Sequence, residues 1–197
     1  MAALPEIKAV AISGSPRAGG NTEALLRHCL DRMAAQGVDG ELISLGDLTI
    51  EPCTGCGICR ETPGTGCVIS EDDFEGVFRA MVAADIILVG SPVYFGSATP
   101  NLMALLDRAG YVARGSGNLF SRKLGGPIVV ARRAGQNFTY AQLLMWFMIS
   151  DMVVPGSSYW NMAIGAEPGD VLADVEALST LDRFCDNLVW LGTKLRS

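Results

Sequence analysis

Residues 14–22, Gly-Ser-Pro-Arg-Ala-Gly-Gly-Asn-Thr, combine hydroxyls, an arginine and glycines directly after a short apolar run. At the start of a helix such a segment offers unpaired backbone N–H groups and the positive end of the helix dipole, which together bind phosphate. Arg17 would add a delocalised cation. The spacing is not that of a Walker A loop, because no lysine follows the glycines, and it lacks Gly-x-Gly-x-x-Gly. The alternative is an ordinary turn in which Asn21 or Thr22 caps the helix.

Four of the six cysteines crowd into one short stretch with the spacing Cys-x-x-Cys-x-x-Cys-x7-Cys. They are Cys53, Cys56, Cys59 and Cys67. In a reducing compartment such a cluster indicates metal, iron–sulfur or redox chemistry before a disulfide framework. Four thiolates at this spacing suit a [4Fe–4S] cluster, whereas structural zinc usually needs two well-separated knuckles. Free thiols, a disulfide or a redox-active dithiol are the alternatives.

The remaining candidate residues follow the third apolar run of the chain. Pro92, Val93, Tyr94, Phe95 and Gly96 come directly after it. If that run is a central parallel strand, the loop at its carboxyl end exposes side chains to a ligand. The alternative for the two aromatic residues is packing between the strand and the next helix.

Apolar runs and helical patterns alternate along the chain and must position these residues. Expected strands span residues 8–13, 41–45, 85–91, 127–131 and 152–155. Expected helices span residues 22–35, 101–108, 138–150 and 171–195, with a further helix that Ser70 caps and that carries an apolar stripe from Phe74 to Val82. A loop of about residues 46–70 holds the four cysteines, and a Gly-rich stretch at 110–121 connects the third helix-forming segment to the fourth strand.

This alternation predicts an α/β fold, a doubly wound five-stranded parallel sheet with helices on both faces. Five strands commonly take the order 2-1-3-4-5, in which ligands bind at the carboxyl ends of strands one and three. Those ends are Ser13 and Ser91. The whole chain, residues 1–197, reads as one domain. Cys29 and Cys185 lie in helical patterns and are expected to be small core residues.

The two loops together resemble those of the NADPH-dependent FMN reductase family, over most of residues 7–155. The resemblance rests on Gly-Ser-Pro-Arg with a following Asn-Thr, and on Ser-Pro-Val-Tyr-Phe-Gly at 91–96. The resemblance implies a flavodoxin-like fold with bound FMN. It implies phosphate contacts from Ser13, Ser15, Arg17, Asn21 and Thr22, and flavin-ring contacts from residues 92–96. The turn 132–136, with Arg132 and Gly135, would border the ring, although it departs from the Gly-rich family form. Solvated surface charge is the alternative for Arg132 and Arg133.

The cysteine run resembles that of the iron–sulfur flavoproteins, a branch in which a [4Fe–4S] cluster lies close to FMN. The two resemblances imply an FMN-dependent oxidoreductase of the FMN or quinone reductase type, with NAD(P)H as cosubstrate or a ferredoxin-type donor. The alternative is a non-enzymatic electron carrier, but the phosphate loop differs from the Thr/Ser-rich loop of true flavodoxins. No catalytic side chain is expected, and His28, the only histidine, is expected to be structural or exposed.

The amino-acid composition indicates which kinds of partner the protein has. Hydrophobic residues make up 49% of the chain and charged residues 18%, which suggests a buried subunit interface. With the apolar segment 143–149, this composition suggests a homodimer or homotetramer; the alternative for that segment is a place in the core. The net charge of −6 argues against nucleic acid. No secretory signal and no apolar run of about 18 residues are visible, so a cytoplasmic protein without a membrane span is expected.

Overall fold

The structure, a computed structural model, describes residues 7–196 and is built on a five-stranded, all-parallel sheet. The strand order β2-β1-β3-β4-β5 confirms the predicted topology. The strands are β1 (Ile7–Ser13), β2 (Val38–Ser44), β3 (Ile86–Pro92), β4 (Leu124–Ala131) and β5 (Met162–Ile164). The helices are α1 (Asn21–Ala34), α2 (Ile58–Glu61), α3 (Phe74–Ala83), α4 (Pro100–Gly115), α5 (Gln136–Ile149), the 3₁₀ helix η1 (Asp170–Ala173) and α6 (Val175–Arg196). The N-terminal segment, where no signal sequence is expected, lies mostly outside the described residues.

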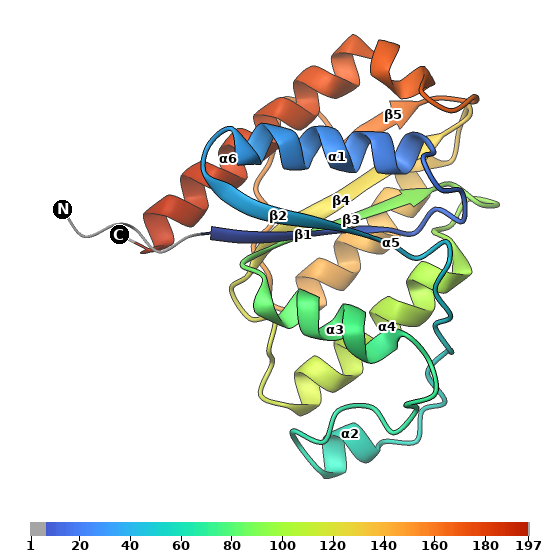
Figure 1. Cartoon of the computed structure of the whole chain (residues 1–197), viewed down its shortest axis with the longest axis vertical. Helices are drawn as coiled ribbons and strands as arrows, with labels where there is room; N and C mark the ends of the chain where they lie inside the picture. Colours follow the sequence, from blue (N-terminus) through green and yellow to red (C-terminus); the bar gives the residue numbers. More distant parts are fainter. Residues whose placement is uncertain (1–6, 197) are drawn as a thin grey trace.

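Helices cover both faces of the sheet (Figure 1). On one face α1 and α6 bury side chains such as Leu25 and Phe184 against the strands. On the other face α3, α4 and α5 enclose a larger core that contains Phe120 and Trp146. Residues 86–89 of β3 are buried on both faces, as expected for a central parallel strand. Burying each large apolar side chain contributes about 1.5–3 kcal/mol, which holds the helices against the sheet.

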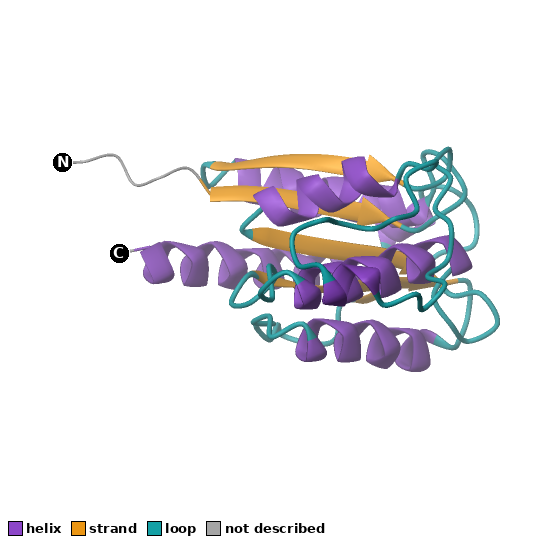
Figure 2. Cartoon of the chain, turned by 90° about the horizontal axis from the view of Figure 1, so that it is seen from below, coloured by secondary structure: helices purple, strands orange, loops and turns teal. Residues whose placement is uncertain are grey.

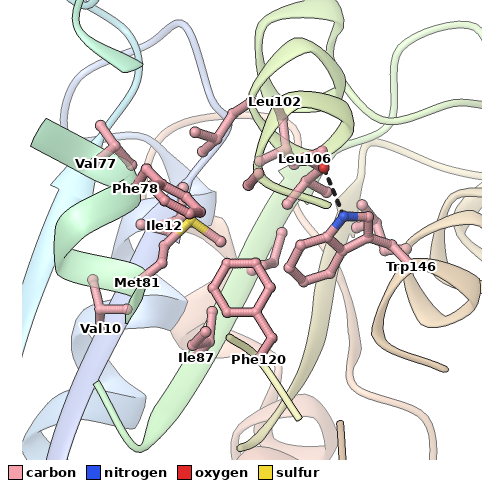
Figure 3. Packing of buried hydrophobic residues seen from close by; sticks show 14 of the residues in the cluster. Val10, Ile12, Val77, Phe78, Met81, Ile87, Leu102, Leu106, Phe120 and Trp146 are labelled. Carbon is pink, nitrogen blue, oxygen red and sulfur yellow. Dashed lines mark hydrogen bonds between the residues drawn. The ribbon is translucent and has the colours of Figure 1, made fainter. Parts of the chain in front are cut away.

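Helix α4 is longer than the sequence pattern predicts. The Gly-rich connection expected at residues 110–121 is wrong in its first part, because the helix continues through Gly110 to Gly115. Helix α5 lies close to this position: a Cβ at Gly110 would sit 3.3 Å from Nε1 of Trp146, a tight contact. That indole nitrogen donates a hydrogen bond to the carbonyl of Leu106 at 2.7 Å (Figure 3). Close helix packing therefore overrides the low helix propensity of glycine.

The last strand lies elsewhere than predicted. Residues 152–155 were expected to form it, but β5 is Met162–Ile164, which pairs in parallel with Val129–Ala131 of β4. In the predicted segment Val153 makes one isolated bridge to Leu124. Pro155 has no N–H to offer a ladder. The position of β5 determines which loop reaches the functional edge of the sheet.

The start of α3 also differs from the prediction. The helix begins at Phe74, so Ser70 does not cap it, and the Oδ1 of Asp72 accepts the N–H of Phe74 at 3.3 Å. The cysteine loop (residues 46–70) contains the short helix α2, which the sequence pattern does not reveal. Thr49 and Asp73 close the base of this loop. The N–H of Thr49 donates to Oδ2 of Asp73 at 2.8 Å, and the N–H of Asp73 donates to the carbonyl of Thr49 at 2.9 Å.

The carboxyl ends of the strands meet at one edge, where the loops that follow them gather (Figure 2). None of the helices in residues 7–196 combines the length and the apolar character needed to span a lipid bilayer.

Candidate functional site

The ends of β1 and β3 carry two buried serines that hold the neighbouring loops. The hydroxyl of Ser91 accepts the N–H of Thr99 at 3.2 Å and donates to the carbonyl of Pro92 at 2.8 Å. The hydroxyl of Thr99 donates to the carbonyl of Gly14 at 2.7 Å. Ser13 Oγ accepts the N–H of Ser15 at 3.4 Å. These bonds tie the loops after β1 and β3 to each other through the start of α4.

The phosphate loop (residues 14–20) is folded around hydrogen bonds between residues close together in sequence. The Oγ of Ser15 lies 3.2 Å from the N–H of Arg17 and 3.3 Å from its carbonyl. Gly19 has a φ of +65°, and its N–H donates to the buried carboxylate of Glu23 at 3.0 Å. No side chain in the described residues caps the N-terminus of α1. The first N–H groups of this helix are therefore available to an anion.

A cavity of about 450 Å³, here called the loop cavity, opens beside the phosphate loop. Residues of four segments line it, and eight of them are predicted site residues: Ser15, Arg17, Asn21, Thr22, Pro92, Val93, Tyr94 and Arg132. The structure thus brings together three loops that are far apart in sequence. The other four predicted residues, Ser13, Phe95, Gly96 and Gly135, are not part of this lining, and their direct contact with a cofactor stays a prediction.

Phe95 and Gly96 form the tip of a tight turn beside the loop cavity. Tyr94 and Ser97 exchange backbone hydrogen bonds of 2.9 and 3.1 Å across this turn. Phe95 has a φ of +52° and is fully exposed at 110%. A positive φ is uncommon for a bulky residue and marks local strain, which often accompanies function. Gly135 has a φ of +95°, and a Cβ there would lie 2.9 Å from Cγ1 of Val93, so this glycine lets Val93 pack.

A fourth wall of the loop cavity was missed by the sequence reasoning. It is the segment Gly165–Pro168, which follows β5. The side-chain amide of Asn21 holds this wall: Nδ2 donates to the carbonyl of Glu167 at 2.9 Å, and Oδ1 accepts the N–H of Gly169 at 2.8 Å. A Cβ at Gly165 would lie 2.7 Å from that amide nitrogen. The available signal was the run Gly-Ala-Glu-Pro-Gly at 165–169, but the misplaced last strand concealed it.

A second cavity of about 120 Å³, the cysteine cavity, lies between the cysteine loop and α4. All four clustered cysteines line it: Cys53, Cys56, Cys59 and Cys67. None of them is in a disulfide. Burial, and then the charges of the other three thiols, raise the pKa of Cys59, in line with their proximity.

The chemistry of this donor set decides which metal group it fits. In the part of the chain that the structure describes, no three His, Cys, Asp or Glu side chains are arranged to hold a single metal ion. A [4Fe–4S] cluster takes one thiolate at each of four separate iron corners, whereas zinc draws its ligands around one point. Four thiols spread around one cavity therefore match a cluster better than a single ion.

Helix α4 forms the floor of the cysteine cavity with Arg108, Tyr111 and Val112. At the end of the helix the cysteine loop lies directly on Gly115, where an added Cβ would overlap the carbonyl oxygen of Cys59. The glycine is thus required by close approach of two backbones. The cysteine loop is held against a rigid element, as a metal site requires.

The other candidate residues prove structural. His28, expected to be structural or exposed, is partly exposed and contacts Asp182 of α6 at 2.8 Å. Cys29 and Cys185 are fully buried between α1 and α6, as predicted.

Comparisons with known proteins show the family and the fold of this chain. A family model described as NADPH-dependent FMN reductase matches residues 7–167. The chain is 38% identical over 181 residues to an iron–sulfur flavoprotein of Methanocaldococcus jannaschii, covering 88% of this chain and 91% of that protein. It is 32% identical over 186 residues to an iron–sulfur flavoprotein of Methanosarcina thermophila, covering 92% and 95%. A solved structure titled as a flavodoxin, WrbA-like protein from Agrobacterium tumefaciens matches with a TM-score of 0.66 at 13% identity, covering 98% of this chain and 99% of that one, which shows the flavodoxin-like fold.

Proposed function

We propose that this chain, which belongs to the NADPH-dependent FMN reductase family and is a flavin-dependent oxidoreductase, is an iron–sulfur flavoprotein. FMN would lie in the loop cavity and a [4Fe–4S] cluster in the cysteine cavity. The observation that carries the proposal is the cysteine cavity, lined by four thiols that form no disulfide. Two relatives aligned over most of the chain are named iron–sulfur flavoproteins, which supports it.

The residues around the loop cavity fit FMN in charge and shape. The uncapped N-terminus of α1, with Ser15, Arg17 and Thr22, would hold the phosphate. Pro92, Val93 and Tyr94 offer an apolar surface to the ring. Arg132 lines the same cavity and would favour an anionic reduced ring. FMN, when bound, supplies two-electron chemistry with a hydride and one-electron chemistry with other centres.

In the cysteine cavity the four cysteines would each supply one thiolate ligand. The cluster, when bound, supplies one-electron transfer. We therefore propose that the protein exchanges electron pairs with NAD(P)H, or receives electrons from a ferredoxin-type protein, and passes them on singly. The chain itself binds and orients both groups and needs no side-chain nucleophile.

Anaerobic purification followed by absorption spectroscopy, with iron and acid-labile sulfide assays, tests the proposal. We expect one flavin and about four irons per chain. Flavin without iron would contradict the cluster and leave a thiol-bearing flavin reductase. Rapid bleaching of the flavin by NADPH would identify a nicotinamide donor, and bleaching only by reduced ferredoxin would identify a protein donor.

We also propose that the protein is a homodimer or homotetramer. Helix α5 exposes four large apolar side chains, each between 62% and 77% accessible: Phe138, Met145, Met148 and Ile149. Several large apolar side chains exposed on one helix favour an interaction site there. Analytical ultracentrifugation at micromolar concentration should show a dimer or tetramer, and a monomer would contradict the proposal.

The wall at 165–168 gives a first prediction. Asn21→Ala removes both hydrogen bonds that hold it, each of which contributes about 0.5–1.5 kcal/mol. The apoprotein should therefore bind FMN about tenfold more weakly, as measured by quenching of flavin fluorescence. Asn187→Ala is the control, because it removes a loop-holding amide bond to Gly156, which does not line the loop cavity. Equal FMN affinity in the two variants would show that the wall does not support the cofactor.

The contact between the cysteine loop and α4 gives a second prediction. In Gly115→Ala the new methyl group overlaps the Cys59 carbonyl, and such overpacking costs about 1–3 kcal/mol. The loop must shift, so we expect fewer irons per chain with unchanged flavin content. Gly76→Ala in α3 is the matched control, because nothing lies near its added Cβ and stability should rise by about 0.5–1 kcal/mol. Full iron content in Gly115→Ala would refute the role of this contact.

A further inference from the structure

Arg108 carries the largest fully buried side chain of the described residues, and it lies beside the cysteine cavity. Its side chain is 0% exposed and that of its partner Asp72 is 1% exposed. A buried charge costs several kcal/mol, so it persists only where its hydrogen bonds are made or where it has a role. The flavin chemistry proposed above does not use it.

The contacts of Arg108 join α4 to both sides of the cysteine run. Nη1 donates to the carboxylate of Asp72 and to the carbonyl of Glu51, the latter at 3.1 Å. Nη2 donates to the carbonyl of Ile69 at 2.8 Å. The guanidinium also stacks on the Phe74 ring, 4.0 Å from its centre. Since residue 51 precedes the four cysteines and residue 69 follows them, one side chain holds both arms of the loop.

The charge of Arg108 is oriented with respect to the cavity. Arg108 is part of the cavity lining, whereas Asp72 is not. The Nε group is buried and has no hydrogen-bond partner among the described residues. Arg108 and Cys67 line the same cavity. The ion pair therefore presents its positive member to the cavity.

We propose that Arg108 is the positioning residue of the cysteine cavity: it anchors both arms of the cysteine loop to α4 and raises the reduction potential of the group that the four thiolates hold. This inference rests on the proposed cluster. A thiolate-ligated cluster becomes more negative on reduction, so an adjacent fixed cation stabilises its reduced form. Asp72, which pairs with Arg108 and is not part of the cavity lining, moderates the effect with its opposite charge.

Two substitutions separate this electrostatic role from simple packing. Arg108→Gln removes the cation and should shift the midpoint potential of the cluster to more negative values. Asp72→Asn keeps the cation and removes its counter-charge, so the midpoint should move in the opposite direction. The midpoint is read by anaerobic titration followed by electron paramagnetic resonance. We expect at least a tenfold change in the ratio of reduced to oxidised cluster at a fixed solution potential, about 59 mV for a one-electron couple.

Controls make each result decisive. Arg114→Gln, on the same helix but outside the cavity lining, should leave the potential unchanged. Arg108→Lys should restore the potential in part but hold less iron, because lysine lacks the fork that reaches both loop arms. If Arg108→Gln does not fold or does not bind iron, the midpoint potentials of Asp72→Asn and Arg108→Lys decide whether Arg108 acts through its charge. If the wild type holds four irons and the variants have the same midpoint potential as the wild type, this inference alone is overturned. A wild type without iron would overturn the cluster and this inference together.

Discussion

Cys56→Ala should reduce the iron content from about four atoms per chain to less than about one while leaving the FMN content unchanged. Cys56 is exposed, so its side chain contributes little to folding, and its loss acts on the ligand set. Removing one thiolate leaves one iron corner without a protein ligand, which makes the cluster unstable. Iron, sulfide and flavin assays on anaerobically purified protein measure the effect.

Cys185→Ala is the matched control for this substitution. Cys185 is also a free cysteine, but it is buried between α1 and α6. Its replacement removes one buried sulfur, which lowers the free energy of unfolding by about 1 kcal/mol and leaves iron unchanged. If Cys56→Ala retained four irons, the cysteine cavity would not be the site of the cluster.

Arg17→Glu should weaken FMN binding by at least about 100-fold, which corresponds to about 2.7 kcal/mol. A hydrogen bond to a charged group contributes about 1.5–3 kcal/mol, and the substitution adds repulsion between the new carboxylate and the phosphate. Arg17 is exposed and lines the loop cavity, so the fold should tolerate the change. Fluorescence titration of the apoprotein with FMN gives the dissociation constant.

Arg27→Glu makes the same charge change on an exposed residue of α1 outside the loop cavity. We expect it to alter FMN affinity less than about threefold, because salt screens exposed charges at a distance. Added salt should narrow the difference between Arg17→Glu and the wild type. Similar affinities for Arg17→Glu and Arg27→Glu would place the phosphate elsewhere.

Much of the fold and part of the site follow from local sequence patterns. The alternation of apolar runs and helical segments predicts the sheet order, and the ends of two runs at Ser13 and Ser91 indicate its functional edge. The confirmed resemblance adds the family and its flavin chemistry. Eight of the twelve predicted cofactor residues then line one cavity, because strand ends that are adjacent in a parallel sheet bring their loops together.

Other features were not predictable because they depend on close packing between distant segments. Strand β5 has three residues and pairs only with the end of β4, so its local pattern is weaker than that of residues 152–155. Gly110 and Gly115 read as loop residues, yet they lie in a helix where Trp146 and Cys59 approach. The propensity of a glycine carries no information about the neighbour that makes it necessary.

The sequence by itself determined the phosphate loop and the presence of four clustered thiols, since each depends on residues close together in the chain. The strand order followed from the alternation of strands and helices and the common topology of five-stranded parallel sheets. Only the tertiary structure decided what surrounds the loop and the thiols. Asn21 holds Glu167 in a wall of the loop cavity, 146 residues along the chain, and Arg108, an ordinary charged residue in a helical pattern, becomes the buried cation beside the cysteines. Burial and long-range hydrogen bonds arise only when helices and strands pack together. They determine the charges and the shape of the surroundings of each candidate residue.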